Sequence, residues 1–187
     1  MRLCVLALLL LVGCTQMPVS SMLKLREVRF ETSDISALRA GVAFPKGLRP
    51  LRGTARLAIE VEPGDGSRLV HSFRLQELGG ADALALANEA GTENVVAYGI
   101  TPSDQLALQS FRSEVLAARA KAEGRPALRL SVAADACRSS ALPDGAIFFS
   151  TYLKTNETGR FVTLARGIDL RALAGDRAES KIGPCPE

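Results

Sequence analysis

Residues 55–75 read ARLAIEVEPGDGSRLVHSFRL, and this stretch decides the expected fold. Apolar and polar residues alternate on both sides of a turn at residues 63–66, Pro-Gly-Asp-Gly. Such alternation is typical of half-buried strands, and the turn residues favour a hairpin between them. The residues expected to face the core are Ala55, Leu57, Ile59 and Val61 in the first strand and Leu69, His71, Phe73 and Leu75 in the second. The stretch therefore predicts an antiparallel β-sheet.

Further short runs of apolar, aromatic and β-branched residues predict more strands along the chain. They cover residues 28–30, 38–44, 95–100, 128–132, 147–154 and 161–164. The last two runs are joined by a short polar segment, in which Gly159 suits the positive φ of a hairpin loop.

One long helix interrupts this pattern. Thr101, Pro102 and Asp104 form a helix start signal, with a capping hydroxyl, a proline in the first turn and an acid after it. Apolar residues then recur at spacings of three and four: Leu108, Phe111, Val115, Ala118 and Ala122. The spacing predicts a helix from about Pro102 to Glu123. Residues 78–91 fit either a short helix or a weak strand.

The pattern as a whole predicts one mainly β domain. With seven or eight short strands, we expect an antiparallel β-sandwich of the immunoglobulin-like type, with the long helix inserted before the last three strands. The alternative is an α+β sheet with the helix packed on one face. The chain has 187 residues, which is enough for one substantial core but too short for two comfortable domains.

The N-terminus carries a targeting signal. Arg2 precedes the apolar run 3–12, Gly13 and Cys14 follow it, and a small polar tract begins at Thr15. The apolar run is about half the length needed to span a bilayer. This combination resembles the lipobox signal of bacterial lipoproteins.

The resemblance implies how the chain is processed and where it lies. Residues 1–13 would be a signal peptide, cleaved before Cys14, whose thiol carries a diacylglyceryl group and whose new terminus is acylated by a fatty acid such as palmitate. Residues 14–22 would form a lipidated tether, and residues 23–187 a single β-rich periplasmic domain. Because Thr15 replaces the aspartate that retains lipoproteins in the inner membrane, we expect the periplasmic leaflet of the outer membrane. The periplasmic face of the inner membrane is the alternative.

The cysteines support a disulfide. If Cys4 leaves with the signal and Cys14 is lipidated, Cys137 and Cys185 remain as a pair in an oxidising compartment. A bond between them would stabilise the fold by about 4 kcal/mol in the loop-entropy model. Two free thiols or half of a metal site are the alternatives.

The charges do not indicate a nucleic-acid partner. The formal net charge of the whole chain is only +3. Residues 46–56 nevertheless carry four positive charges and no acid, on Lys46, Arg49, Arg52 and Arg56. They could contact anionic headgroups near the anchor. A solvated arginine-rich loop is the other interpretation.

The sequence contains no recognisable catalytic, metal or cofactor motif. His71 is the only histidine, and its place on the apolar face of a strand favours a partly buried structural role over catalysis. No serine-nucleophile elbow, nucleotide loop or cluster of metal ligands occurs. We therefore expect no catalytic residue, metal or cofactor.

The functional prediction is a noncatalytic lipoprotein that binds or scaffolds another component of the cell envelope. Its partners would be the membrane, through the N-terminal lipid, and another envelope protein. Two alternatives remain, namely a periplasmic binder of lipids or small apolar ligands, and a periplasmic enzyme with an unrecognised site.

Overall fold

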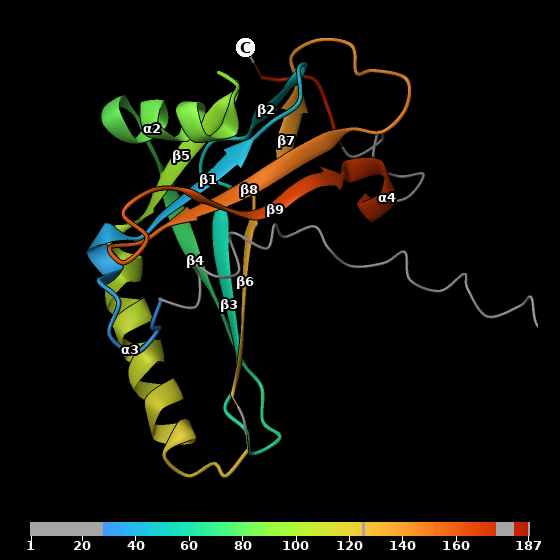
Figure 1. Cartoon of the computed structure of the whole chain (residues 1–187). Coiled ribbons are helices and arrows are strands. Elements are labelled where there is room, and N and C mark those ends of the chain that lie inside the picture. Colours follow the sequence, from blue (N-terminus) through green and yellow to red (C-terminus); the bar gives the residue numbers. More distant parts are fainter. Residues whose placement is uncertain (1–27, 125, 175–181, 187) are drawn as a thin grey trace, which may run out of the picture.

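A computed structural model describes residues 28–124, 126–174 and 182–186 (Figure 1). The strands are β1 (Arg39–Ala43), β2 (Leu48–Pro50), β3 (Arg56–Glu62), β4 (Leu69–Leu78), β5 (Val95–Ile100), β6 (Ala127–Ala133), β7 (Ala136–Arg138), β8 (Phe148–Lys154) and β9 (Val162–Asp169). The helices are the 3-10 turn η1 (Ile35–Ala37), α2 (Gly80–Ala90), α3 (Pro102–Arg119) and α4 (Leu170–Ala174).

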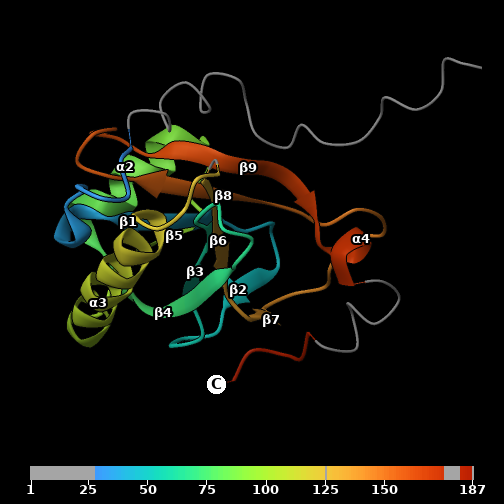
Figure 2. The ribbon, with the colours of Figure 1, turned by 90° about the horizontal axis from the view of Figure 1, so that it is seen from below.

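Seven strands form one antiparallel sheet in the order β6-β3-β4-β5-β1-β8-β9, while β2 and β7 pair separately. The large sheet is curled. Its two edge strands, β6 and β9, lie at opposite ends of the strand order, yet residues from both line one common pocket. The views in Figures 1 and 2 show α3 along the β3–β4 side and α2 near β5 and β1. The curl gives the sheet a concave face that holds the main core and a convex face that α2 partly covers.

The mainly β prediction is confirmed, and so is the hairpin that defined it. β3 and β4 pair with Leu57 opposite Phe73, and burial alternates strictly along β3. The immunoglobulin-like sandwich is not confirmed, because all the longer strands join one sheet instead of two facing sheets. Periodicity shows which side of a strand is apolar, but not what packs against that side. Here helix α3 and the curl of the sheet itself bury the apolar side, in place of a second sheet.

The predicted long helix is confirmed in type and start. The Thr101 hydroxyl accepts a hydrogen bond from the Asp104 N–H, and three apolar residues of α3 pack into the concave core: Leu108, Phe111 and Val115. The prediction that the helix reaches Glu123 is wrong, since α3 ends at Arg119 and turn hydrogen bonds replace the helical pattern. One such bond runs from the Ala122 N–H to the Arg119 carbonyl.

The structure decides two further segments, residues 28–30 and residues 78–91. Residues 28–30 do not form the predicted strand, because the Thr32 and Ser33 N–H groups both donate to the Arg29 carbonyl and close a turn. The ambiguous segment 78–91 contains helix α2, which ends at Gly91 in the left-handed conformation.

Helix α2 packs on the convex face through Leu86, which is fully buried. The strand below it carries Gly41, where an added Cβ would lie 2.7 Å from two carbons of Leu86. A side chain at this position would therefore force the fully buried Leu86 side chain to shift.

No helix within the described ranges is long and apolar enough to cross a bilayer. Residues 1–27 include the predicted signal peptide, Cys14, the whole predicted tether and the first five residues of the predicted domain, and they lie outside the described residues.

Candidate ligand-binding pocket

The concave face of the sheet is divided into a covered half and an open half. Helix α3 covers the part around Phe73, where Phe111 stacks edge-on against it with ring centroids 6.0 Å apart. The part near Val42 on β1 and Val132 on β6 is hollow and forms a pocket of about 410 Å³. This volume lies within the range of small-molecule sites in proteins.

The pocket is lined almost entirely by apolar side chains. Of the 17 described residues that line it, only Ser131 and Thr151 carry polar side chains, and none carries a titratable one. The apolar members are Val42, Phe44, Pro45, Leu48, Leu130, Val132, Ala133, Ala134, Ala136, Ile147, Phe149, Leu164, Ala165, Ile168 and Leu170. Such a surface favours apolar groups of a ligand, since burying apolar surface is favourable and an unpaired polar group would lose its hydration there.

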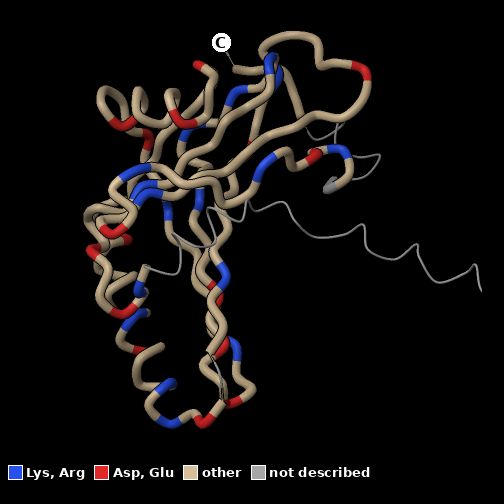
Figure 3. Tube along the Cα trace, viewed as in Figure 1, with Lys and Arg blue, Asp and Glu red and all other residues tan. Residues whose placement is uncertain are grey.

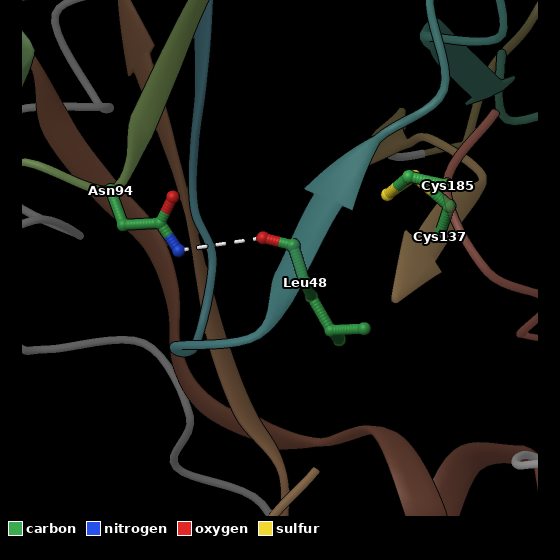
Figure 4. The surroundings of a disulfide bond; sticks show 4 residues. All are labelled: Leu48, Asn94, Cys137 and Cys185. Carbon is green, nitrogen blue, oxygen red and sulfur yellow. Dashed lines mark hydrogen bonds between the residues drawn. A yellow bond between two sulfur atoms is a disulfide. The ribbon is translucent and has the colours of Figure 1, made fainter. Parts of the chain in front are cut away.

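One wall of the pocket is the turn between β1 and β2. The Leu48 N–H donates to the Pro45 carbonyl at 3.3 Å, and Gly47 at the third position has a φ of 87°, which L side chains rarely adopt. The Asn94 side-chain amide donates to the carbonyls of Phe44 at 3.1 Å and Pro45 at 2.8 Å, with a longer contact to Leu48 (Figure 4). Asn94, the residue just before β5, thus holds the turn in place.

A disulfide closes the wall beside that turn, as predicted. Cys137 on β7 and Cys185 are bonded, with their Cα atoms 4.8 Å apart (Figure 4). The bond keeps the C-terminal segment against β7, where the Arg138 N–H donates to the Gly183 carbonyl. In this position Ile182 packs with Leu48 and Ile147, both of which line the pocket.

A further part of the pocket lining is formed where β9 meets α4, and Leu170 there packs against the cluster of Leu48, Ile147 and Ile182. One Asp169 carboxylate oxygen accepts hydrogen bonds from the N–H groups of Ile147 and Arg171. The Arg171 guanidinium donates to the Pro143 carbonyl, which ties α4 to the loop before β8. These contacts place Ile168 and Leu170 along the pocket.

The structure separates the four basic residues that the sequence grouped. Lys46 is exposed and stands in the turn between the lining residues Pro45 and Leu48. Arg49 is exposed on the opposite face of the β2–β7 pair from Leu48, and Arg52 is exposed in the following turn. Arg56 donates to the carbonyls of Gly53 and Ala55, so its guanidinium is engaged by the protein backbone. Figure 3 shows positive and negative residues distributed over many elements of the fold.

The expectation of a partly buried His71 is wrong, because this residue is exposed. One side of its imidazole lies against two aromatic rings, with centroid distances of 4.5 Å to Phe73 and 5.6 Å to Phe111. Within the described ranges, no group of three or more His, Cys, Asp or Glu residues is arranged to hold a metal ion.

A polar cluster lies beside the middle of α3, and none of its residues lines the pocket. Arg112 donates to the Ser33 carbonyl at 2.7 Å, and the Ser33 hydroxyl donates to Glu157 at 2.6 Å. Burial lowers the pKa of Arg112, although the carboxylates of Asp34 and Glu157 oppose the shift. The cluster joins the N-terminal turn, α3 and the β8–β9 loop, and the adjoining cavity of about 30 Å³ has room for about one water molecule. These contacts indicate a structural role.

Sequence reasoning missed the pocket itself. Alternation predicted the inward orientation of residues such as Leu130 and Val132, but an inward residue can meet a helix, another strand or empty space. Arg138 beside the pocket also escaped notice, because it lies about 90 residues from Lys46 in the chain.

Comparisons with known protein families, with curated proteins and with solved structures found no match to this chain.

Proposed function

We propose that this chain is a noncatalytic, lipid-anchored protein of the bacterial cell envelope whose β-rich domain binds the apolar part of a ligand in the pocket between β6 and β9. The observation that carries the binding proposal is the hollow half of the concave face, with its almost wholly apolar lining. The anchoring proposal is supported by the N-terminal signal that ends at Cys14. Together the two proposals describe an apolar-ligand binder anchored close to the periplasmic leaflet of a membrane, and we propose the outer membrane.

The apolar lining gives a quantitative expectation for binding. Each methylene group transferred from water to an apolar environment contributes about 0.8 kcal/mol. Affinity for a series of straight-chain alcohols should therefore rise about fourfold per added methylene until the pocket is full.

The test uses the full-length chain carrying Cys14→Ser, which lacks the proposed lipid attachment site. Binding of the uncharged fluorophore phenylnaphthylamine is measured, and octanol, decanol and dodecanol compete for it. Ala165→Phe, which puts a large ring into the pocket, should weaken binding about tenfold or more. Ala85→Phe, on the exposed side of α2, is the matched control.

Unchanged binding in the Ala165→Phe variant, with unfolding curves like those of the parent chain, would contradict the pocket proposal. All the proteins in this comparison share residues 1–27, so any binding by that apolar segment is common to them.

Anchoring is tested separately in cells. Radiolabelled palmitate should be incorporated into the wild-type chain and not into Cys14→Ser, and the wild type should fractionate with the outer membrane. Equal labelling of both proteins would contradict lipidation at Cys14.

A further inference from the structure

Two positively charged residues neighbour the lining residue Leu48 at one end of the β2–β7 pair. Arg138 belongs to β7 and is the antiparallel partner of Leu48 on β2. Lys46 stands two residues before Leu48, in the turn that Asn94 holds. Both cations are exposed, whereas Leu48 is buried in the pocket wall.

Strand geometry places Arg138 on the pocket side of this pair. Residues directly opposite in an antiparallel pair point to the same face, as do residues two apart in one strand. Arg138 therefore shares a face with Leu48 and with Ala136, and both of these line the pocket. Arg49, paired with Cys137, points to the other face.

A backbone hydrogen bond keeps Lys46 close to the same end of β7. The Ser139 N–H donates to the Gly47 carbonyl at 2.9 Å, so the turn that carries Lys46 is joined to the residue after Arg138. The two cations thus belong to adjoining backbone segments, next to the lining residue Leu48.

Neither cation is neutralised by a described neighbour. Six other cations in the described ranges form salt bridges with carboxylates: Arg39, Arg68, Arg74, Arg119, Arg129 and Lys154. Lys46 and Arg138 have no such bridge to a described residue. Among the described residues, no carboxylate in an ion pair with them competes with an external anion for their charges.

The two carboxylates nearest in sequence to lining residues, Asp169 and Asp135, form no described salt bridge with Lys46 or Arg138. Asp169 accepts from the N–H groups of Ile147 and Arg171 on the β9 side. Asp135 stands at the other end of the β2–β7 pair, where its carbonyl accepts from the Leu51 N–H.

We propose that the ligand of the pocket is a single-chain anionic amphiphile of the fatty-acid type, with its chain in the pocket and its carboxylate held by Lys46 and Arg138. This inference rests on the proposed apolar-ligand function and names the ligand class of the same site. The guanidinium of Arg138 and the ammonium of Lys46 supply charge-assisted hydrogen bonds to the carboxylate. A volume of about 410 Å³ lies near the lower end of the usual range, which suits one acyl chain better than a two-chain lipid.

The test compares dodecanoate with dodecanol, which differ in charge and share the chain length, as competitors of phenylnaphthylamine on the Cys14→Ser chain. Dodecanoate should bind about tenfold more tightly, because the site adds charge-assisted hydrogen bonds. This preference should weaken as salt is added. The double variant Lys46→Glu/Arg138→Glu should abolish the preference and leave dodecanol binding unchanged.

The control is the double variant Arg49→Glu/Arg52→Glu, which changes the net charge by the same amount away from the pocket face. It should keep the preference for dodecanoate. Equal binding of dodecanoate and dodecanol by the parent chain, or equal effects of the two double variants, would overturn the inference while leaving the apolar pocket intact. Failure of both competitors would instead contradict the proposed function. If the first double variant does not fold, Lys46→Gln/Arg138→Gln replaces it.

Discussion

At the scale of single residues, Asn94 shows how one side chain shapes the pocket. Its amide reaches from the start of β5 to the carbonyls of Phe44 and Pro45, and its own carbonyl accepts from the Phe44 N–H. The turn that carries Lys46 and Leu48 depends on these contacts, because the polar backbone groups there need partners.

Replacing Asn94 with Asp tests this role without changing the side-chain shape. A carboxylate cannot donate a hydrogen bond to the two carbonyl oxygens that the amide now binds. We therefore expect the free energy of unfolding to fall by about 1–3 kcal/mol. Urea unfolding measures the change. Asn88→Asp, on the exposed side of α2, serves as the control and should change the stability little. Equal stability of Asn94→Asp and the parent would show that the turn does not need the amide.

At the scale of elements, two helices cover different faces of one sheet. Helix α3 packs its apolar stripe on the concave face, whereas α2 approaches the convex face over Gly41. The polar side of α2 is also tied down, because Asp82 pairs with Arg39 on β1 and Lys154 on β8. Two neighbouring strands are thereby linked to one helix.

The pairing of Asp82 predicts a dependence on pH. Burial alone would raise the pKa of Asp82, but the hydrogen bonds from Lys154 and Arg39 outweigh it and hold the pKa below its ordinary value. The stabilisation is therefore complete above about pH 4, where the unfolded carboxylate is ionised, and is lost as the pH falls through the lower folded pKa.

Asp82→Asn should accordingly lower the free energy of unfolding by about 1 kcal/mol near neutral pH, and the difference from the parent should shrink in acid. Chemical unfolding measured across a pH series follows this difference. Asp144→Asn, in the exposed loop before β8, provides the comparison. If the difference in unfolding free energy between Asp82→Asn and the parent stayed constant down to the most acidic pH, the stabilising role of the ionised Asp82 carboxylate would be contradicted.

At the scale of the whole molecule, the sheet curls until its edge strands face one pocket, and a covalent bond fastens the C-terminal segment to that region. The Cys137–Cys185 bond spans 48 residues and brings Ile182 against the pocket wall. Loss of this bond should therefore lower the stability of the fold and also change the wall of the pocket.

Replacing both cysteines with serine should cost about 4 kcal/mol of unfolding free energy in the loop-entropy model. The same substitution should weaken binding of phenylnaphthylamine, because Ile182 is no longer held against Leu48 and Ile147. Urea unfolding with and without a reductant gives the stability term. A reductant should destabilise the parent and leave the double variant unchanged, and an unaffected parent would contradict the prediction.

Much of the secondary structure could be predicted from local patterns. The β3–β4 hairpin follows from strict alternation around Pro63–Gly66, and the start of α3 follows from the capping signal at Thr101. The failures occurred where local signals compete. Val28 and Phe30 have strand-like side chains, but hydrogen bonds to the Arg29 carbonyl turn the backbone there.

By itself, the sequence determined the strands, the long helix, the cysteine pair and the resemblance of the N-terminus to a lipoprotein signal. The strands, the helix and the signal depend on residue types close together in the chain. The cysteine pair follows because the other two cysteines were assigned to the signal and the lipid. Only the tertiary structure decided that the strands join one curled sheet, that α3 leaves half of the concave face hollow, and that the backbone segments of Arg138 and Lys46 adjoin next to Leu48. The physical reason is that alternation specifies which side of a strand seeks burial, while the curl of the sheet and the length of the covering helix decide where that burial stays incomplete.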